Sequence, residues 1–150
     1  MSLKQTIDSD IKKAMLAKDK DSLRALRAVK SQILLAETEK GSTEELTEET
    51  ELKLLQKAVK QRNDSISIYK EQGREDLAEV EQLEVDVISK YLPAQLSAEA
   101  LEIEIEAIIK QTGATGPQDM GKVMGVASKA LAGKADGKAI ADTVKSILNR

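Results

Sequence analysis

Apolar residues recur three and four positions apart through nearly the whole chain, which is the spacing of one side of an α-helix. The sequence holds two tyrosines, no phenylalanine and no tryptophan, so its core must consist of Leu, Ile, Val, Ala and Met side chains. Helices pack such side chains well. We therefore predict an all-α fold without strands.

Cap and breaker residues divide this pattern into two lobes. Pro93 forces the residue before it out of helical geometry. We predict an N-terminal helical hairpin or bundle lobe at residues 1–93 and a small C-terminal three-helix bundle at residues 94–150, together forming one domain. The first predicted helix runs from Ser2 to the polar break at residues 18–21, and the second runs from a cap at Asp21 or Ser22 to about Gly41. A loop follows at Gly41-Ser42-Thr43. The third helix runs from Thr47 to about Gly73, and the fourth runs from about Arg74 to about Tyr91. The predicted C-terminal helices run from Ser97 to Gly113, from Gly116-Pro117 and Asp119 to Gly133, and onward from Asp136.

Missing residue types limit the chemistry that this chain can perform. It has no histidine and no cysteine, which excludes Ser-His-Asp and Cys-His catalysis and removes the usual ligands of zinc and softer metals. We expect no catalytic residue, no metal and no cofactor. Because the sequence shows no disulfide framework, no apolar leader and no run of roughly 20 apolar residues, we expect a cytoplasmic location and no membrane partner.

Charge is unevenly distributed along the chain. The net charge is −3, which by itself does not indicate a nucleic-acid-binding protein. Residues 1–40 hold nine basic and six acidic residues, residues 41–95 hold seven and thirteen, and the remaining residues hold seven of each. A basic face can therefore form toward either end, while the middle is acidic.

One basic residue interrupts an apolar stripe of the third predicted helix, and one acidic residue interrupts the matching stripe of the fourth. An unpaired charge in such a seam would cost on the order of a few kcal/mol, so we predict that Arg62 pairs with Glu84 or with its neighbour Glu81. A structural ion pair is the favoured interpretation, and a ligand site at the pair is the alternative. The two stripes consist of Leu55, Val59, Arg62, Ile66 and Tyr69, and of Leu77, Val80, Glu84, Val87 and Tyr91.

Two glycines lie four positions apart in the sixth predicted helix. Gly121 and Gly125 share one side of that helix, and each costs about 1 kcal/mol relative to alanine, so the close approach of another backbone should compensate. A neighbouring helix is the commoner explanation. The alternative is the sugar-phosphate chain of an RNA, with Lys122 beside it to meet a phosphate.

Basic residues gather in the small lobe. Lys122, Lys129, Lys134 and Lys138 cluster around the turn at residues 133–137, where the following helix offers free backbone amides to an anion. A solvated surface is the commoner explanation for such lysines. A second basic row, under the same reservation, consists of Arg24, Arg27 and Lys30.

Several segments that follow one another along the whole chain resemble the GatB/YqeY family, and the length fits its free-standing YqeY-like members. They are Arg24-Ala25-Leu26-Arg27, Lys60-Gln61-Arg62-Asn63-Asp64-Ser65-Ile66, Gly73-Arg74-Glu75-Asp76-Leu77-Ala78, Tyr91-Leu92-Pro93 with Glu81 and Glu84 ahead of it, Asp119-Met120-Gly121-Lys122-Val123-Met124-Gly125, and Ala135-Asp136-Gly137.

The resemblance implies a domain similar to the C-terminal tail of the B subunit of the glutamine-dependent aspartyl/glutamyl-tRNA amidotransferase, a tail that helps to grip the tRNA. The family label is carbon–nitrogen ligase activity with glutamine as amido-N-donor. This chain has no room for the kinase-like cradle or the glutaminase of that enzyme. The resemblance thus implies association with the chemistry rather than catalysis, and it carries over no catalytic residues.

Two functions follow as hypotheses. The first is a tRNA-binding or tRNA-amidotransferase-related accessory module, with tRNA or an amidotransferase as partner and no DNA partner expected. Its nucleic-acid-binding residues would be Gly121, Gly125 and the four small-lobe lysines. The rival is a helical protein-interaction module without RNA binding, which the negative net charge and the lack of aromatic side chains for base stacking favour. A small independent enzyme is the least favoured class.

Overall fold

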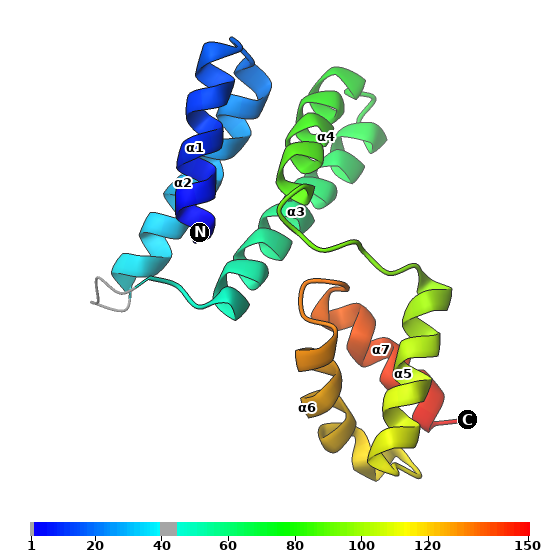
Figure 1. Cartoon of the computed structure of the whole chain (residues 1–150). Helices are drawn as coiled ribbons and strands as arrows, with labels where there is room; N and C mark the ends of the chain where they lie inside the picture. Colours follow the sequence, from blue (N-terminus) through cyan, green and yellow to red (C-terminus); the bar gives the residue numbers. More distant parts are fainter. Residues whose placement is uncertain (1, 40–44) are drawn as a thin grey trace. The chain divides into compact units, whose positions relative to one another are not determined.

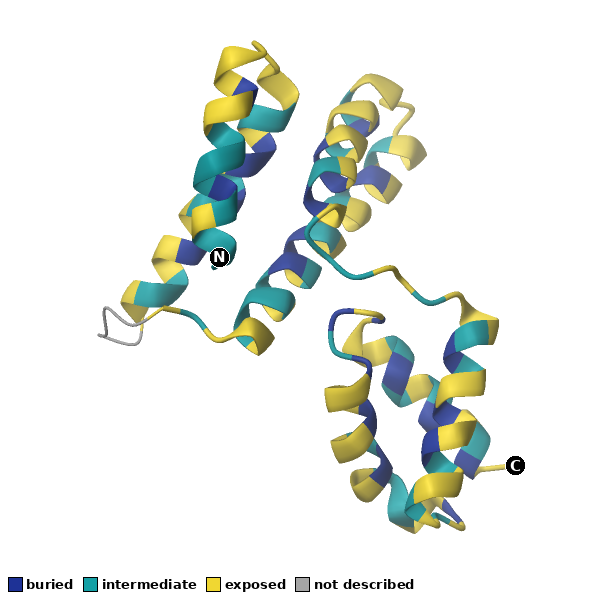
Figure 2. Ribbon diagram, viewed as in Figure 1, coloured by how far each residue is buried: buried dark blue, intermediate teal, exposed yellow. Residues whose placement is uncertain are grey.

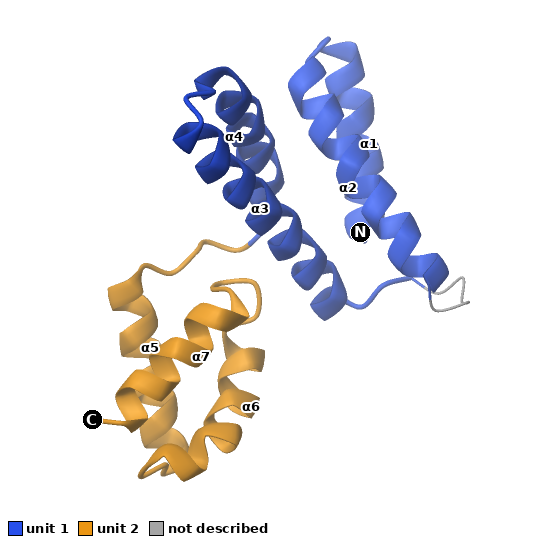
Figure 3. Ribbon diagram, turned by 180° about the vertical axis from the view of Figure 1, so that it is seen from behind, with its two compact units in different colours: residues 1–92 blue, residues 93–150 orange. Residues whose placement is uncertain are grey.

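The computed structural model describes residues 2–39 and 45–150, and these form seven α-helices and the 3-10 turn η1 (Figure 1). The chain divides into two compact units, residues 1–92 and residues 93–150 (Figure 3). The predicted all-α fold is confirmed, since no residue in the described ranges lies in a strand. The predicted loop at Gly41-Ser42-Thr43 lies outside the described residues, as does the predicted end of the second helix near Gly41.

Unit 1 consists of two helical hairpins. Helix α1 packs on α2, α3 packs on α4, and α2 also contacts α4. Hydroxyl caps start α1 and α3, where Ser2 and Thr47 accept hydrogen bonds from first-turn amides. The four helices are α1 (Leu3–Leu16), α2 (Lys20–Glu39), α3 (Glu48–Glu71) and α4 (Glu75–Ser89).

The cap of α2 differs from the prediction. Instead of Asp21 or Ser22, Asp19 caps the helix, with its Oδ1 atom accepting from the Ser22 amide at 3.1 Å and its Oδ2 atom accepting from the Ser22 hydroxyl at 2.6 Å. Lys18 adopts a left-handed conformation with φ of 56°, so the chain reverses direction immediately after α1 and α2 begins earlier. The hydrogen bonds from Ser22 hold the pKa of the Asp19 carboxyl below its ordinary value.

The core of unit 1 is aliphatic, as the residue types of the sequence predicted, and its side chains come from all four helices. The apolar stripe predicted for α4 is wrong in part, because Val80 is 39% exposed while Ala78 and Val85 are buried against Ile66 of α3. Helix α4 has apolar residues on adjacent sides, and spacing alone does not tell which side a neighbour covers. The fully buried members of the larger cluster include Ile7, Val29, Ile33, Leu55 and Ile88.

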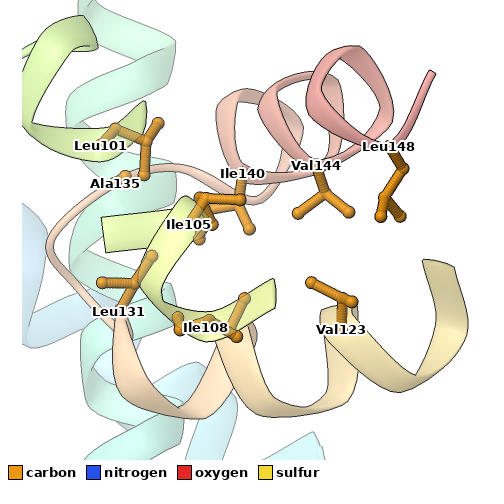
Figure 4. Packing of buried hydrophobic residues seen from close by; sticks show 10 residues of the cluster. Leu101, Ile105, Ile108, Val123, Leu131, Ala135, Ile140, Val144 and Leu148 are labelled. Carbon is orange, nitrogen blue, oxygen red and sulfur yellow. The ribbon is translucent and has the colours of Figure 1, made fainter. Parts of the chain in front are cut away.

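Unit 2 is a small three-helix bundle with its own core. Helices α5 (Ala98–Thr112), α6 (Met120–Ala130) and α7 (Gly137–Leu148) pack pairwise, with η1 (Pro117–Asp119) leading into α6. Helix α6 ends three residues before the predicted end at Gly133, which instead takes a positive φ of 77° in the following turn. The side chains that meet in the interior are Leu101, Ile105, Ile108, Val123, Leu131, Ala135, Ile140, Val144 and Leu148 (Figure 4).

The segment that enters unit 2 is hydrogen-bonded to the turn between α6 and α7. The Leu96 amide donates to the Lys134 carbonyl at 2.9 Å, and the Gln95 side-chain amide donates to the Gly133 carbonyl at 2.7 Å. On the other side of this turn, the Asp136 carboxylate caps α7 by accepting from the Ala139 amide at 2.6 Å. The turn is therefore held from both sides, which positions the residues that it exposes.

Candidate nucleic-acid interface

Helix α6 presents one side to the core and another to solvent. Val123 and Ala127 are fully buried, and they lie four residues apart on the side that faces α5 and α7. The opposite side is exposed along its length (Figure 2). We call this exposed side the α6 face, and it consists of Gly121, Lys122, Gly125, Val126, Ser128 and Lys129.

The two glycines of the α6 face contact no other helix of unit 2. A Cβ atom built at Gly121 or at Gly125 would have nothing within 4 Å from the described residues, apart from the helix's own nearby backbone. Among the helices of unit 2, the neighbour that we expected to compensate for these glycines is therefore absent, and an explanation from packing within this unit is wrong. Unit 2 is small enough that α5 and α7 cover only the Val123 side of α6, which leaves the glycine side open.

The start of α6 is set by a local network. The Asp119 carboxylate accepts a hydrogen bond from the Thr115 amide at 2.9 Å, which is the main reason that the pKa of Asp119 lies below its ordinary value. The positive charge of Lys122 lowers the pKa further. The Asp119 carboxylate thus stabilises the turn before α6, and it is not within ion-pair distance of Lys122 in the structure.

Lys134 and Lys138 extend the basic surface beyond α6. Both are exposed, on either side of the Asp136 cap. Residues 120–135 contain three lysines and no acidic residue. Within the described ranges, none of Lys122, Lys129, Lys134 and Lys138 makes an ion pair. Their ammonium groups thus remain available to an anionic partner, and the nearby carboxylates of Asp119 and Asp136 are engaged with backbone amides.

The second basic row, on α2, is arranged differently. Arg24 lies 2.9 Å from Asp21 and 3.7 Å from Glu84, and Lys30 lies 2.6 Å from Asp8. Carboxylates of unit 1 therefore neutralise two of its three members, and Arg27 is left exposed. In this respect the row on α2 differs from the four small-lobe lysines, which make no ion pair within the described ranges.

The structure brings Arg62 and Glu84 together across α3 and α4. The Arg62 Nη2 atom lies 3.7 Å from Glu84 Oε1, with side-chain exposures of 17% and 9%. Arg62 Nη1 donates to the Ala58 carbonyl at 2.9 Å, whereas its buried Nε atom has no hydrogen-bond partner in the described chain. Glu81 is not an ion-pair partner of Arg62 in the described part of the chain, although it lies one turn away on α4.

Sequence reasoning missed two further polar contacts of unit 1. Arg24 of α2 also reaches Glu84, so the carboxylate lies between two guanidinium groups. The Tyr91 hydroxyl donates to the Asp10 carboxylate, and burial, followed by this hydrogen bond, raises the pKa of the Tyr91 phenol. Both contacts join residues far apart in the sequence, and no local pattern marks them.

Neither a metal-binding cluster nor a membrane span is found where the chain is described. No group of three or more Asp or Glu side chains among the described residues is arranged to hold a metal ion. No helix there is both long enough and apolar enough to span a bilayer. What unit 2 offers is an exposed helix side of small residues and lysines.

Comparison with known proteins identifies the family. The family model described as Yqey-like protein matches residues 4–148, which is nearly the whole chain. The chain belongs to the Yqey-like family. The resemblance to YqeY proteins noted in the sequence is thereby confirmed.

Curated relatives of this Yqey-like chain carry the name altered inheritance of mitochondria protein 41, mitochondrial. The relative from Clavispora lusitaniae is 37% identical over 103 residues, covering 69% of this chain and 59% of the relative. The one from Pyrenophora tritici-repentis is 32% identical over 133 residues, covering 86% and 71%. The one from Candida glabrata is 35% identical over 115 residues, covering 75% and 63%. The chain thus spans roughly three fifths to seven tenths of these relatives' length.

The relatives correct one expectation. Each of these three proteins is named as mitochondrial, which contradicts the cytoplasmic location predicted from the sequence. That prediction rested on absent signals, namely disulfides, an apolar leader and a membrane span. None of these is needed by a protein of an internal organelle, and the reasoning therefore could not distinguish the two locations.

Proposed function

We propose that this Yqey-like protein binds tRNA through the α6 face and the adjoining turn, and acts as an accessory module in tRNA-dependent chemistry such as amidation. The observation that carries the proposal is a set of four exposed lysines of unit 2, two along α6 and two around the start of α7, that make no ion pair within the described chain. Counterion release from the RNA backbone would supply the binding free energy.

The exposed glycines support an RNA backbone as the partner. Because Gly121 and Gly125 carry no side chain and have no neighbour on that side, a partner's backbone can come close to α6 while Lys122 and Lys129 reach phosphates. The chain offers no aromatic platform for unstacked bases, and Tyr91 is already bonded to Asp10. Recognition would then depend on the shape and backbone of folded RNA, and duplex DNA of equal length should compete more weakly.

The amidotransferase connection is part of the same proposal. It rests on what the resemblance of the sequence to the GatB/YqeY family implies, namely a domain similar to the tail of the amidotransferase B subunit. The protein would deliver or hold tRNA for an enzyme and would not transfer the amide by itself.

The test is the affinity of the full chain for tRNA across a salt series, measured by fluorescence anisotropy. The double variant Lys122→Glu/Lys129→Glu should bind at least about tenfold more weakly and should reduce the slope of log K against log salt by about 1.5 to 2, corresponding to two lost phosphate contacts. The matched control is Lys110→Glu/Lys145→Glu, which makes the same change of charge at exposed lysines of α5 and α7.

The controls separate the outcomes. If both double variants weaken binding equally, a general charge effect replaces the proposed interface. If the unmodified chain shows no tRNA binding even at low salt, the proposal fails. The alternative function, a helical protein-interaction module without RNA binding, is favoured by the net charge of −3, and it predicts this second result.

A further inference from the structure

A second surface of unit 2 lies between α5 and α7, apart from the α6 face. A groove of about 540 Å³ runs here, and its lining is mostly apolar. The lining residues are Ile103, Glu106, Ala107, Ile109, Lys110, Ala114 and Ile147. All belong to one unit, so the groove does not depend on how the two units are placed.

The groove contains an isoleucine that the core does not use. Ile103 is 66% exposed in the middle of α5, with Ala107 one turn further along the same side. A β-branched residue is a weaker helix former than alanine or leucine, and its exposed side chain gains no burial here. Single exposed apolar residues are common, but Ile103 adjoins the half-buried Ile109 and Ile147, which extends the apolar surface across two helices.

The surroundings of the groove are acidic. Helix α5 carries four glutamates and one lysine. Arg150 offsets part of this charge by contacting Glu102 and Glu106, whereas Glu99 and Glu104 are exposed and make no ion pair within the described ranges. The lining itself holds one acidic and one basic residue, Glu106 and Lys110, so the excess negative charge lies beside the groove on α5, where it repels nucleic acid and attracts a basic partner.

We propose that the groove between α5 and α7 binds one amphipathic helix of a protein partner, with the apolar side of that helix on Ile103, Ala107 and Ile147. Basic residues along the flank of the partner helix meet the glutamates of α5. An apolar groove that receives residues at helical spacing is an established mode of peptide recognition. The proposal goes beyond tRNA binding and does not depend on it, because it uses other helices and the opposite sign of charge.

The test uses a defined probe on the full chain. A synthetic amphipathic helical peptide of leucine and lysine is compared with the same peptide carrying glutamate in place of every lysine. The expected result is saturable binding of the lysine peptide, with NMR shift changes at the methyl groups of Ile103 and Ile147, and much weaker binding of the glutamate peptide.

Two variants locate the binding site. Ile103→Ser should weaken binding of the lysine peptide about tenfold, as loss of a central apolar anchor does. Val126→Ser is the matched control, since Val126 is also a β-branched residue, 37% exposed, on α6 of the same unit; it should leave binding unchanged. Circular dichroism confirms that both variants fold.

Three results would overturn the proposal. These are absence of binding by the lysine peptide, equal binding of the two peptides, and equal effects of the two substitutions. The double variant Lys122→Glu/Lys129→Glu should keep its affinity for the lysine peptide, and its loss of tRNA affinity tests the α6 face separately. The experiments can therefore refute the groove proposal and the tRNA proposal independently of each other.

Discussion

Replacing Arg62 by alanine should destabilise unit 1 by about 2–3 kcal/mol. Removing one partner of a buried ion pair costs about 3–5 kcal/mol, because the other charge is left without compensation. Two features of the structure reduce this figure. Arg62 and Glu84 lie 3.7 Å apart without a hydrogen bond between them, and Arg24, also at 3.7 Å from Glu84, remains to compensate in part.

The two tyrosines make the measurement specific to unit 1. Tyr69 and Tyr91 both lie within residues 1–92, so tyrosine fluorescence during urea unfolding reports this unit, while circular dichroism reports both. A loss of about 2 kcal/mol corresponds to a fall of about 10 °C in the melting temperature of a unit of this size.

The design includes a cycle and a control. Arg62→Met combined with Glu84→Leu removes both charges. The double variant should lose about 1–2 kcal/mol less free energy of unfolding than the summed losses of Arg62→Met and Glu84→Leu measured singly. Lys53→Ala removes one partner of an exposed pair on the same helix, where Lys53 and Glu49 lie 3.2 Å apart, and it should change stability by less than about 0.5 kcal/mol. The reasoning is refuted if Arg62→Ala behaves like Lys53→Ala, or if the double variant shows no coupling.

Three further predictions concern single residues. Gly125→Ala should stabilise unit 2 by up to about 1 kcal/mol in thermal unfolding followed by circular dichroism, because the added methyl meets nothing within 4 Å; a loss of stability would show that the site is crowded. Ser97→Ala should destabilise unit 2 by about 1 kcal/mol, since its hydroxyl caps α5 by accepting from the Ala100 amide at 3.1 Å, and an unchanged urea midpoint would contradict that role. The pKa of Tyr91 is raised above its ordinary value of 10.0, so the stability from its neutral phenol is present below pH 10 and is lost as the pH rises above it. Tyr91→Phe should therefore lose less stability between pH 9 and 11 than the unmodified chain, and parallel curves would refute this.

Local signals in the sequence determined most helix starts and turns. Thr47, Ser97 and Asp136 cap helices where they were expected, because a cap depends only on a side chain and the amide two or three residues later. Gly113 takes a positive φ of 73° at the end of α5 for the same local reason. The cap of α2 was misplaced because Asp19, Asp21 and Ser22 lie close together and each can cap a helix, and the reversal at Lys18 selected Asp19.

Features that depend on neighbours could be predicted only in part. The interrupted stripes correctly suggested Arg62 and Glu84 as residues that should meet, but the second guanidinium at Glu84 comes from α2 and follows from how the hairpins pack. Packing likewise decided which side of α4 is buried.

The candidate functional surfaces, too, follow partly from the sequence and partly from the tertiary structure. The sequence by itself determined which residue types exist, and so excluded histidine and cysteine chemistry, and it showed that four lysines fall within residues 122–138. Only the tertiary structure decided that Gly121 and Gly125 face away from α5 and α7, that carboxylates pair with two of the three basic residues of the α2 row but with none of the four small-lobe lysines in the described chain, and that Ile103 lines an open groove. The physical reason is that spacing along a helix fixes which side chains share a side, whereas exposure and pairing depend on what other helices bring to that side.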